Sequence, residues 1–144
     1  MGVIRSGTTS GHDWLFEAFE HPDRGLTLQV RRPDWPGGSS SSGLPVPEPC
    51  MFFTVASVLK YAGVRLNLLC GVAVESIASI EMAIDDVGTV TVPTLEGDLD
   101  VSLRFYVCPI EIETGVVEVV AFDTEGNRVG DKERQEFMPL RRMS

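Results

Sequence analysis

The sequence predicts an all-β protein of the sandwich or barrel type. Between residues 50 and 138, seven short segments are rich in β-branched, aromatic and other apolar residues. Some of them alternate apolar with polar residues, as in "ASIEMAIDD" (78–86), and this is the period of a half-buried strand. Turn signals such as "DDVG", "LEGD" and "TEGN" separate the segments. Short strands at this spacing are typical of a sandwich or a barrel.

The seven predicted strands follow one another closely along the chain. They cover residues 50–59, 64–74, 78–86, 88–95, 99–112, 115–123 and 127–138. One assignment has an alternative, because Ile77, Ile80 and Ile84 also fit a helical period and Ser76 could cap a helix there. The strands predicted on both sides favour a strand for residues 77–87 as well.

Two stretches of this region resemble bacterial immunoglobulin-like domains of the E-set type. The first reads "IASIEMAID" and the second "GVVEVVAFDTEGN". The matching positions are Ile77, Ser79, Ile80, Glu81, Ile84 and Asp85, and then Gly115, Val117, Val119, Ala121, Asp123, Gly126 and Asn127. The resemblance covers about residues 46–138. It implies an immunoglobulin-like antiparallel β-sandwich of about seven strands, used for binding or structure. The cysteine pair of antibody-type domains is absent.

An N-terminal arm, residues 1–36, precedes this domain. The stretch "DWLFEAFE" (13–20) predicts a short helix capped by Asp13, and "LTLQV" (26–30) predicts a strand. Residues 37–49 are rich in Gly, Ser and Pro, which predicts a linker or an extended loop. The arm is too short for a core of its own. Its aromatic residues must therefore pack on the main body or on a neighbouring molecule; they are Trp14, Phe16, Phe19 and Trp35.

The charge of the chain limits its partners. The 144 residues carry a net charge of −9, which divides into −2 in residues 1–49, −9 in residues 50–127 and +2 in residues 128–144. An acidic protein is a poor ligand for nucleic acid or for anionic membranes, so neither is expected as a partner. The basic tail, residues 139–144, contains Arg141 and Arg142. It is either solvated or docks on the acidic face of another copy.

The sequence gives little indication of a metal-binding or catalytic site. The turn after residue 123 contains Asp123, Glu125, Asn127 and Asp131, but it lacks the dense oxygen ligands of a calcium loop. We therefore predict that Asp123 accepts hydrogen bonds from turn amides. His12, Asp13 and His21 could be imagined as metal ligands, but the favoured interpretation is that the two histidines are surface residues that bind no metal. No catalytic motif is present, and no cofactor, metal site or enzymatic activity is expected.

The three cysteines fit no metal or redox spacing. Cys70 and Cys108 lie in apolar runs, which predicts buried structural thiols. If the chain were exported, a bridge between Cys50 and Cys70 would be an alternative. The first eleven residues lack the apolar core of a secretory signal peptide, so we expect a cytoplasmic protein or one incorporated in a virus-like particle.

These observations favour a non-catalytic structural or interaction subunit. It would assemble with copies of itself or with other subunits, for example in a phage capsid or tail. The arm would provide the contact, and the expected partner-binding residues are Trp14, Phe16, Phe19, Trp35, Arg141 and Arg142. On this view the sandwich should fold without residues 1–36. The alternative is an accessory binding module for glycans or for a protein, and a small hydrolase or metal enzyme ranks below both.

Overall fold

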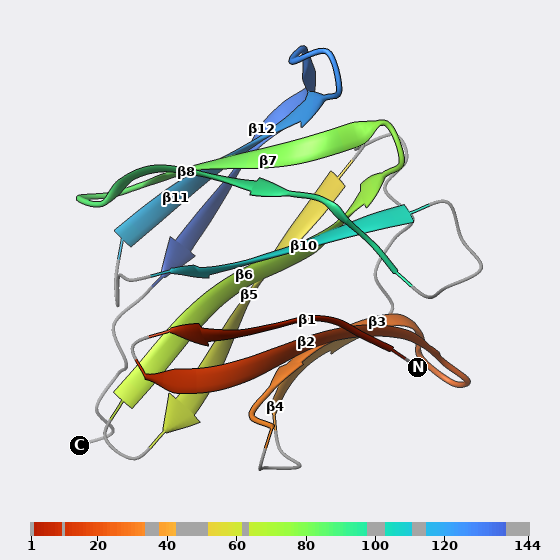
Figure 1. Ribbon diagram of the computed structural model, residues 1–144, viewed down its shortest axis with the longest axis vertical. Helices are drawn as coiled ribbons and strands as arrows, with labels where there is room; N and C mark the ends of the chain where they lie inside the picture. The colour runs from red at the N-terminus through yellow and green to blue at the C-terminus, as the bar shows by residue number, and fades with distance from the viewer. Residues whose placement is uncertain are drawn as a thin grey trace.

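A computed structural model of the chain describes residues 2–9, 11–33, 38–42, 52–61, 64–97, 103–110 and 115–137. These residues form twelve strands and no helix, in three four-stranded antiparallel sheets (Figure 1). The prediction of an all-β protein with antiparallel sheets is therefore confirmed. We name the sheets A, B and C in chain order. This part of the chain accordingly contains no helix of the length and apolarity needed to cross a membrane.

Sheet A is built by the N-terminal segment. Its order is β1-β2-β3-β4, with β1 (Gly2–Thr9), β2 (His12–His21), β3 (Gly25–Arg31) and β4 (Gly38–Ser42). The strand predicted over residues 26–30 is confirmed as part of β3. The structure differs from the predicted linker at residues 37–49, because β4 lies inside it and pairs with β3. The other linker residues lie outside the described part of the chain.

The predicted helix over residues 13–20 is wrong, because these residues belong to β2. Trp14, Phe16 and Ala18 are buried at two-residue spacing, the period of a strand. Asp13, expected to cap the helix, instead accepts a hydrogen bond from Thr8 Oγ1 at 2.5 Å across the β1–β2 hairpin. A short aromatic-rich segment can fit either period. Pairing with β1 on one side and β3 on the other selects the strand.

Sheets B and C contain the strands predicted between residues 50 and 138. Sheet B has the order β5-β6-β10-β9, with β5 (Phe52–Tyr61), β6 (Val64–Val74), β10 (Leu103–Ile110) and β9 (Leu95–Glu96). Sheet C has the order β12-β11-β7-β8, with β12 (Arg128–Phe137), β11 (Gly115–Asp123), β7 (Ile77–Ile84) and β8 (Gly88–Pro93). All seven predicted strands are confirmed, including the strand favoured over a helix at residues 77–87.

The three sheets stack in layers, and sheet B is the middle layer (Figure 1). Sheets B and C enclose one apolar core, which includes Leu69, Tyr106, Ile80, Met82, Val117 and Val119. Sheets A and B enclose a second core, which includes Trp14, Phe16, Leu28, Leu68, Val72 and Phe105. The N-terminal segment therefore covers the outer face of the sandwich formed by sheets B and C, and it does so within the same chain.

Burial of both faces explains the unusual composition of β6. Every residue from 66 to 73 is buried, because odd and even positions of the strand face different cores. A strand buried on both faces is expected to be continuously apolar rather than alternating. Gly71 shows how tightly this layer is packed, since a Cβ atom there would lie 2.3 Å from the Tyr106 hydroxyl oxygen.

The free thiols of this middle layer are buried, as predicted. Cys70 faces sheet A and Cys108 faces sheet C. Burial raises the pKa of the Cys70 thiol to about 12, against a smaller lowering by the Ser57 hydroxyl. Burial raises the pKa of Cys108 to about 11. Both thiols therefore stay protonated and behave as small core residues. Cys50 lies outside the described residues.

Candidate functional site

Of the six residues predicted to bind a partner, the structure describes Trp14, Phe16 and Phe19. Trp14 and Phe16 are buried between sheets A and B, so a partner could reach them only after these sheets had separated. Phe19 lies on the opposite face of β2 and is half-buried. Trp35, Arg141 and Arg142 lie outside the described residues. A role of these side chains in partner binding stays a prediction.

The turn after β11 has the structure predicted for it. Asp123 Oδ1 accepts hydrogen bonds from the N–H groups of Glu125 and Asn127, both at 2.9 Å. The Asp123 N–H donates to Asn127 O at 2.9 Å, and Gly126 adopts a φ of +83°. The Asp123 carboxylate therefore stabilises the turn by accepting hydrogen bonds from its backbone.

The described residues contain no group of three or more His, Cys, Asp and Glu side chains that could hold a metal ion. The imagined set of His12, Asp13 and His21 is spread over the length of β2, because its two histidines occupy the first and last positions of that strand. Nine steps along a strand span about 30 Å, too far for shared ligation.

The two edge strands of sheet C differ in charge. β12 carries six charged residues in its ten positions, and its pairing with β11 shifts register between Val119 and Ala121. Charges and bulges keep an edge strand from pairing with another chain. β8, "GTVTVP", carries no charge and pairs with β7 in unbroken register. Pro93, its last residue, is the only residue of β8 without a backbone N–H donor. Among the described residues no strand pairs with the outer side of β8, so β8 is the uncharged, regular edge of sheet C.

The backbone of β8 directs specific groups toward this free edge. The Thr94 N–H donates to Ala78 O at 3.0 Å, so the rung of these two residues is hydrogen-bonded toward β7. Rungs of an antiparallel pair alternate between hydrogen-bonded and non-hydrogen-bonded. Val90 and Val92, which have the same parity as Thr94, therefore also turn their backbone groups to β7. The N–H and C=O groups of Thr89 and Thr91 face the open edge.

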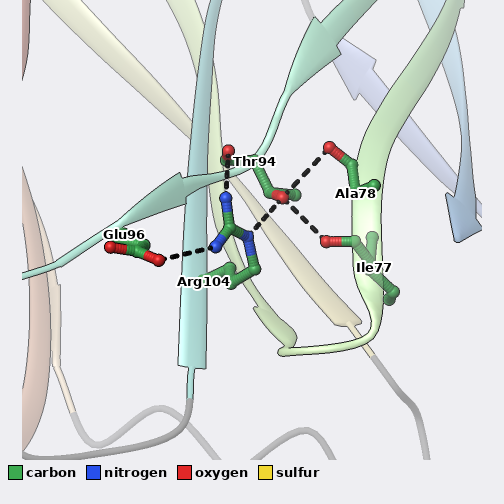
Figure 2. A network of polar contacts seen from close by, with 5 residues as sticks. All are labelled: Ile77, Ala78, Thr94, Glu96 and Arg104. Carbon is green, nitrogen blue, oxygen red and sulfur yellow. Dashed lines mark hydrogen bonds and ion pairs between the residues drawn. The ribbon is translucent and has the colours of Figure 1, made fainter. Parts of the chain in front are cut away.

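The end of β8 is anchored by a polar network around Thr94, where the chain leaves sheet C and enters β9 of sheet B (Figure 2). Thr94 Oγ1 lies 2.7 Å from Ile77 O and 3.1 Å from Ala78 O. Arg104 donates from Nε to Thr94 Oγ1 at 2.7 Å and from Nη2 to Thr94 O at 2.8 Å. A longer contact of 3.5 Å joins Arg104 to the exposed carboxylate of Glu96. The network fixes the position of the free edge relative to sheet B.

A cleft of about 340 Å³ opens beside Val92 of β8. It is bounded by residues 5–9 of β1, by Trp14, and by Val107 and Pro109 of β10. The Arg5 side chain is exposed, and it forms no hydrogen bond or ion pair with another side chain among the described residues. Its lining is mixed, because Trp14, Val92, Val107 and Pro109 are apolar, Ser6, Thr8 and Thr9 carry hydroxyl groups, and Arg5 is the one charged residue among them. The volume is at the lower limit of small-ligand pockets.

The opposite side of the sandwich is closed by polar contacts between β12 and β5. Glu133 accepts hydrogen bonds from the Thr54 N–H at 3.3 Å and from Thr54 Oγ1 at 3.4 Å. Gln135 Nε2 donates to Thr54 O at 3.0 Å. The Tyr106 hydroxyl lies 2.5 Å from Thr54 Oγ1. Burial is the main cause that raises the pKa of both Glu133 and Tyr106. β12 is thus held to sheet B by side-chain contacts along its length, whereas β8 is held at its end, through Thr94 and Arg104, and residues 88–93 form no side-chain hydrogen bond in the described part of the chain.

The open edge could have been noticed in the sequence. Residues 88–94 contain no charged side chain, whereas residues 128–137 contain six. Val87, which directly precedes β8, is 47% exposed, and it is the one exposed large apolar residue among those that the structure describes. The strand order, which makes β8 an edge strand, could not be predicted from the sequence.

Comparison of the chain with models of protein families, with curated proteins and with solved structures finds no match in any of the three.

Proposed function

We propose that this protein is a non-catalytic structural subunit that associates with other protein chains by strand addition at β8. The observation that carries the proposal is the contrast between the two edges of sheet C. β12 is charged, bulged and tied to β5, whereas β8 is uncharged, regular and exposes backbone groups of Thr89 and Thr91. An edge of this kind is a template for another strand.

The proposal includes an immunoglobulin-like body, and the strand order of sheets B and C supports it. In immunoglobulin domains one sheet has the order A-B-E-D and the other contains G, F and C. With β5 taken as strand A, sheet B reads A-B-E-D. Sheet C then reads G-F-C, with β8 added beside strand C. Sheet A has no counterpart in that pattern and forms an additional layer.

Association through β8 replaces the arm as the main proposed contact, because Trp14 and Phe16 pack inside their own chain. A two-fold contact at one edge closes into a dimer and cannot grow further. Incorporation in a larger particle would need a second contact. Phe19, Trp35 and the tail residues Arg141 and Arg142 remain the proposed candidates for it.

Light scattering coupled to size-exclusion chromatography tests this function. The mass of the unmodified chain should rise above 15.7 kDa as its concentration increases. Thr91→Lys places a charge on the exposed edge and should keep the chain at the monomer mass, because like charges and edge lysines oppose strand pairing. Ser76→Lys is the matched control, since it adds the same charge in the exposed turn before β7, outside β8 itself.

The control should associate as the unmodified chain does. Equal association of Thr91→Lys and the unmodified chain would contradict the proposal. A monomer at every concentration would do so as well. It would favour the second candidate function, a binding module that uses the cleft beside Arg5 and Val92.

A further inference from the structure

We infer that the strand added to β8 is β8 of a second copy, running antiparallel, with a two-fold axis at Thr91. The inference rests on the proposed function and specifies its partner and geometry. The result is a continuous sheet made from the two copies of sheet C, with β8 of each copy in the centre.

The faces of β8 limit the register of such a pair. Val90 and Val92 are half-buried toward sheet B, whereas Thr89, Thr91 and Pro93 are exposed. Residues directly opposite each other in an antiparallel pair lie on the same face of the sheet. The two-fold axis must therefore lie midway between the two copies of one residue, so that this residue is opposite its own symmetry mate. If the axis lies at Val90 or at Thr91, most residues of β8 are paired with the second copy.

Side-chain pairing favours Thr91 as the centre. In this register Val90 of each copy lies opposite Val92 of the other, which gives two valine pairs on the inner face. A centre at Val90 would instead place Gly88 opposite Val92 on two rungs. β-Branched cross-strand pairs stabilise a sheet, and glycine provides no side chain to pack. The inner valines of the added strand would also extend over the apolar side of the cleft beside Val92.

Backbone pairing agrees with this centre. Thr91 has its N–H and C=O directed to the free edge, so the two Thr91 residues can exchange both hydrogen bonds across the axis. Thr89 of each copy can donate to the carbonyl of Pro93 in the other. Pro93 has no N–H, so one bond is missing at each end of the pair. No charged residue lies within β8 to oppose the contact.

Disulfide trapping in the full chain tests the register. With Cys50→Ser as background, Thr91→Cys would place two thiols opposite each other at a Cα separation of about 5.5 Å, within the range of a disulfide. Thr89→Cys is the matched control, because Thr89 is also exposed but would not lie opposite its own symmetry mate. Because pairing creates a millimolar effective concentration, we expect Thr91→Cys to form covalent dimers roughly tenfold faster or more. Cys70 and Cys108 are buried and should not compete.

Equal rates for the two variants, or no covalent dimer from Thr91→Cys, would overturn the inference. Cross-linking only in a mixture of Thr89→Cys and Thr91→Cys would also overturn it, because that result indicates a centre at Val90. Failure of the two-fold register can be distinguished from failure of the proposed function. If Thr91→Lys abolishes association while Thr91→Cys does not cross-link, only the two-fold register is wrong. If the unmodified chain is monomeric at every concentration, both fail.

Discussion

Replacing Val119 with aspartate is expected to unfold the protein. Val119 is fully buried in β11, between sheets B and C, together with Val117 and Ala121. The aspartate would be an unpaired buried carboxylate, which costs several kcal/mol. That is a large part of the roughly 5–15 kcal/mol by which domains are stable. Thermal unfolding followed by circular dichroism would show loss of the cooperative transition, or a large fall in melting temperature.

The neighbouring substitution Glu118→Lys is the control for this experiment. Glu118 is half-exposed on the other face of β11, where its carboxylate lies 2.8 Å from Lys132 Nζ. Exchange for lysine removes a surface ion pair and introduces a like-charge contact, each worth about 1 kcal/mol or less. A small effect is therefore expected. Similar damage from both substitutions would contradict the assignment of the buried face of β11.

The substitution Phe16→Ala is expected to have the second largest effect, about 3–5 kcal/mol, as is usual for removing a buried phenylalanine. Phe16 is fully buried in the core between sheets A and B. The same core is the reason that deletion of residues 1–36 should destabilise the whole protein, since it would remove β1, β2 and β3 and expose one face of sheet B. This expectation replaces that of a dispensable arm.

Phe19→Ala is the matched control in chemical denaturation. Phe19 lies on the same strand, but it is half-buried on the face that points away from sheet B. Its removal should cost clearly less than the removal of Phe16, with the same slope of free energy against denaturant. If the two variants were equally stable, sheet A would not be packed on sheet B through the face that contains Phe16.

The strands of the body could be predicted because their local signals agree. In β11, valines at alternate positions and the "TEGN" turn indicate the same strand end. In β2 the local signals conflict, since "DWLFEAFE" fits a helix and a strand, and only pairing with β1 and β3 decides. β1 was not predicted, because "GVIRSGTT" is largely polar and has no alternation. Its strand depends on the hairpin with β2.

One feature of the sequence indicates the three-layer arrangement, but it is easily misinterpreted. Residues 66–73 are almost continuously apolar, which indicates a strand buried on both faces. A simple two-sheet sandwich has no such strand, so the run required a third layer. The identity of that layer depends on long-range packing of Trp14, Phe16 and Leu28, which no local pattern encodes.

The two parts of the candidate site were predictable to different degrees. The role of Asp123 followed from its place before a turn, and it is confirmed by the hydrogen bonds that its carboxylate accepts from the N–H groups of Glu125 and Asn127. The β8 edge was not predicted. Its uncharged sequence was visible, but its free edge is a property of the order β12-β11-β7-β8. That order is set by pairing between segments far apart in the chain.

Hydrogen exchange of the β8 amides at low and high protein concentration tests association at this edge most directly. The amides of Val90 and Val92 face β7 and should be protected at both concentrations. The amides of Thr89 and Thr91 face the free edge. They should exchange rapidly in dilute solution and become protected as concentration rises, because strand addition engages their N–H groups. Rapid exchange of Thr89 and Thr91 at every concentration would contradict association through β8. Protection that instead rises with concentration in β12 would contradict it as well.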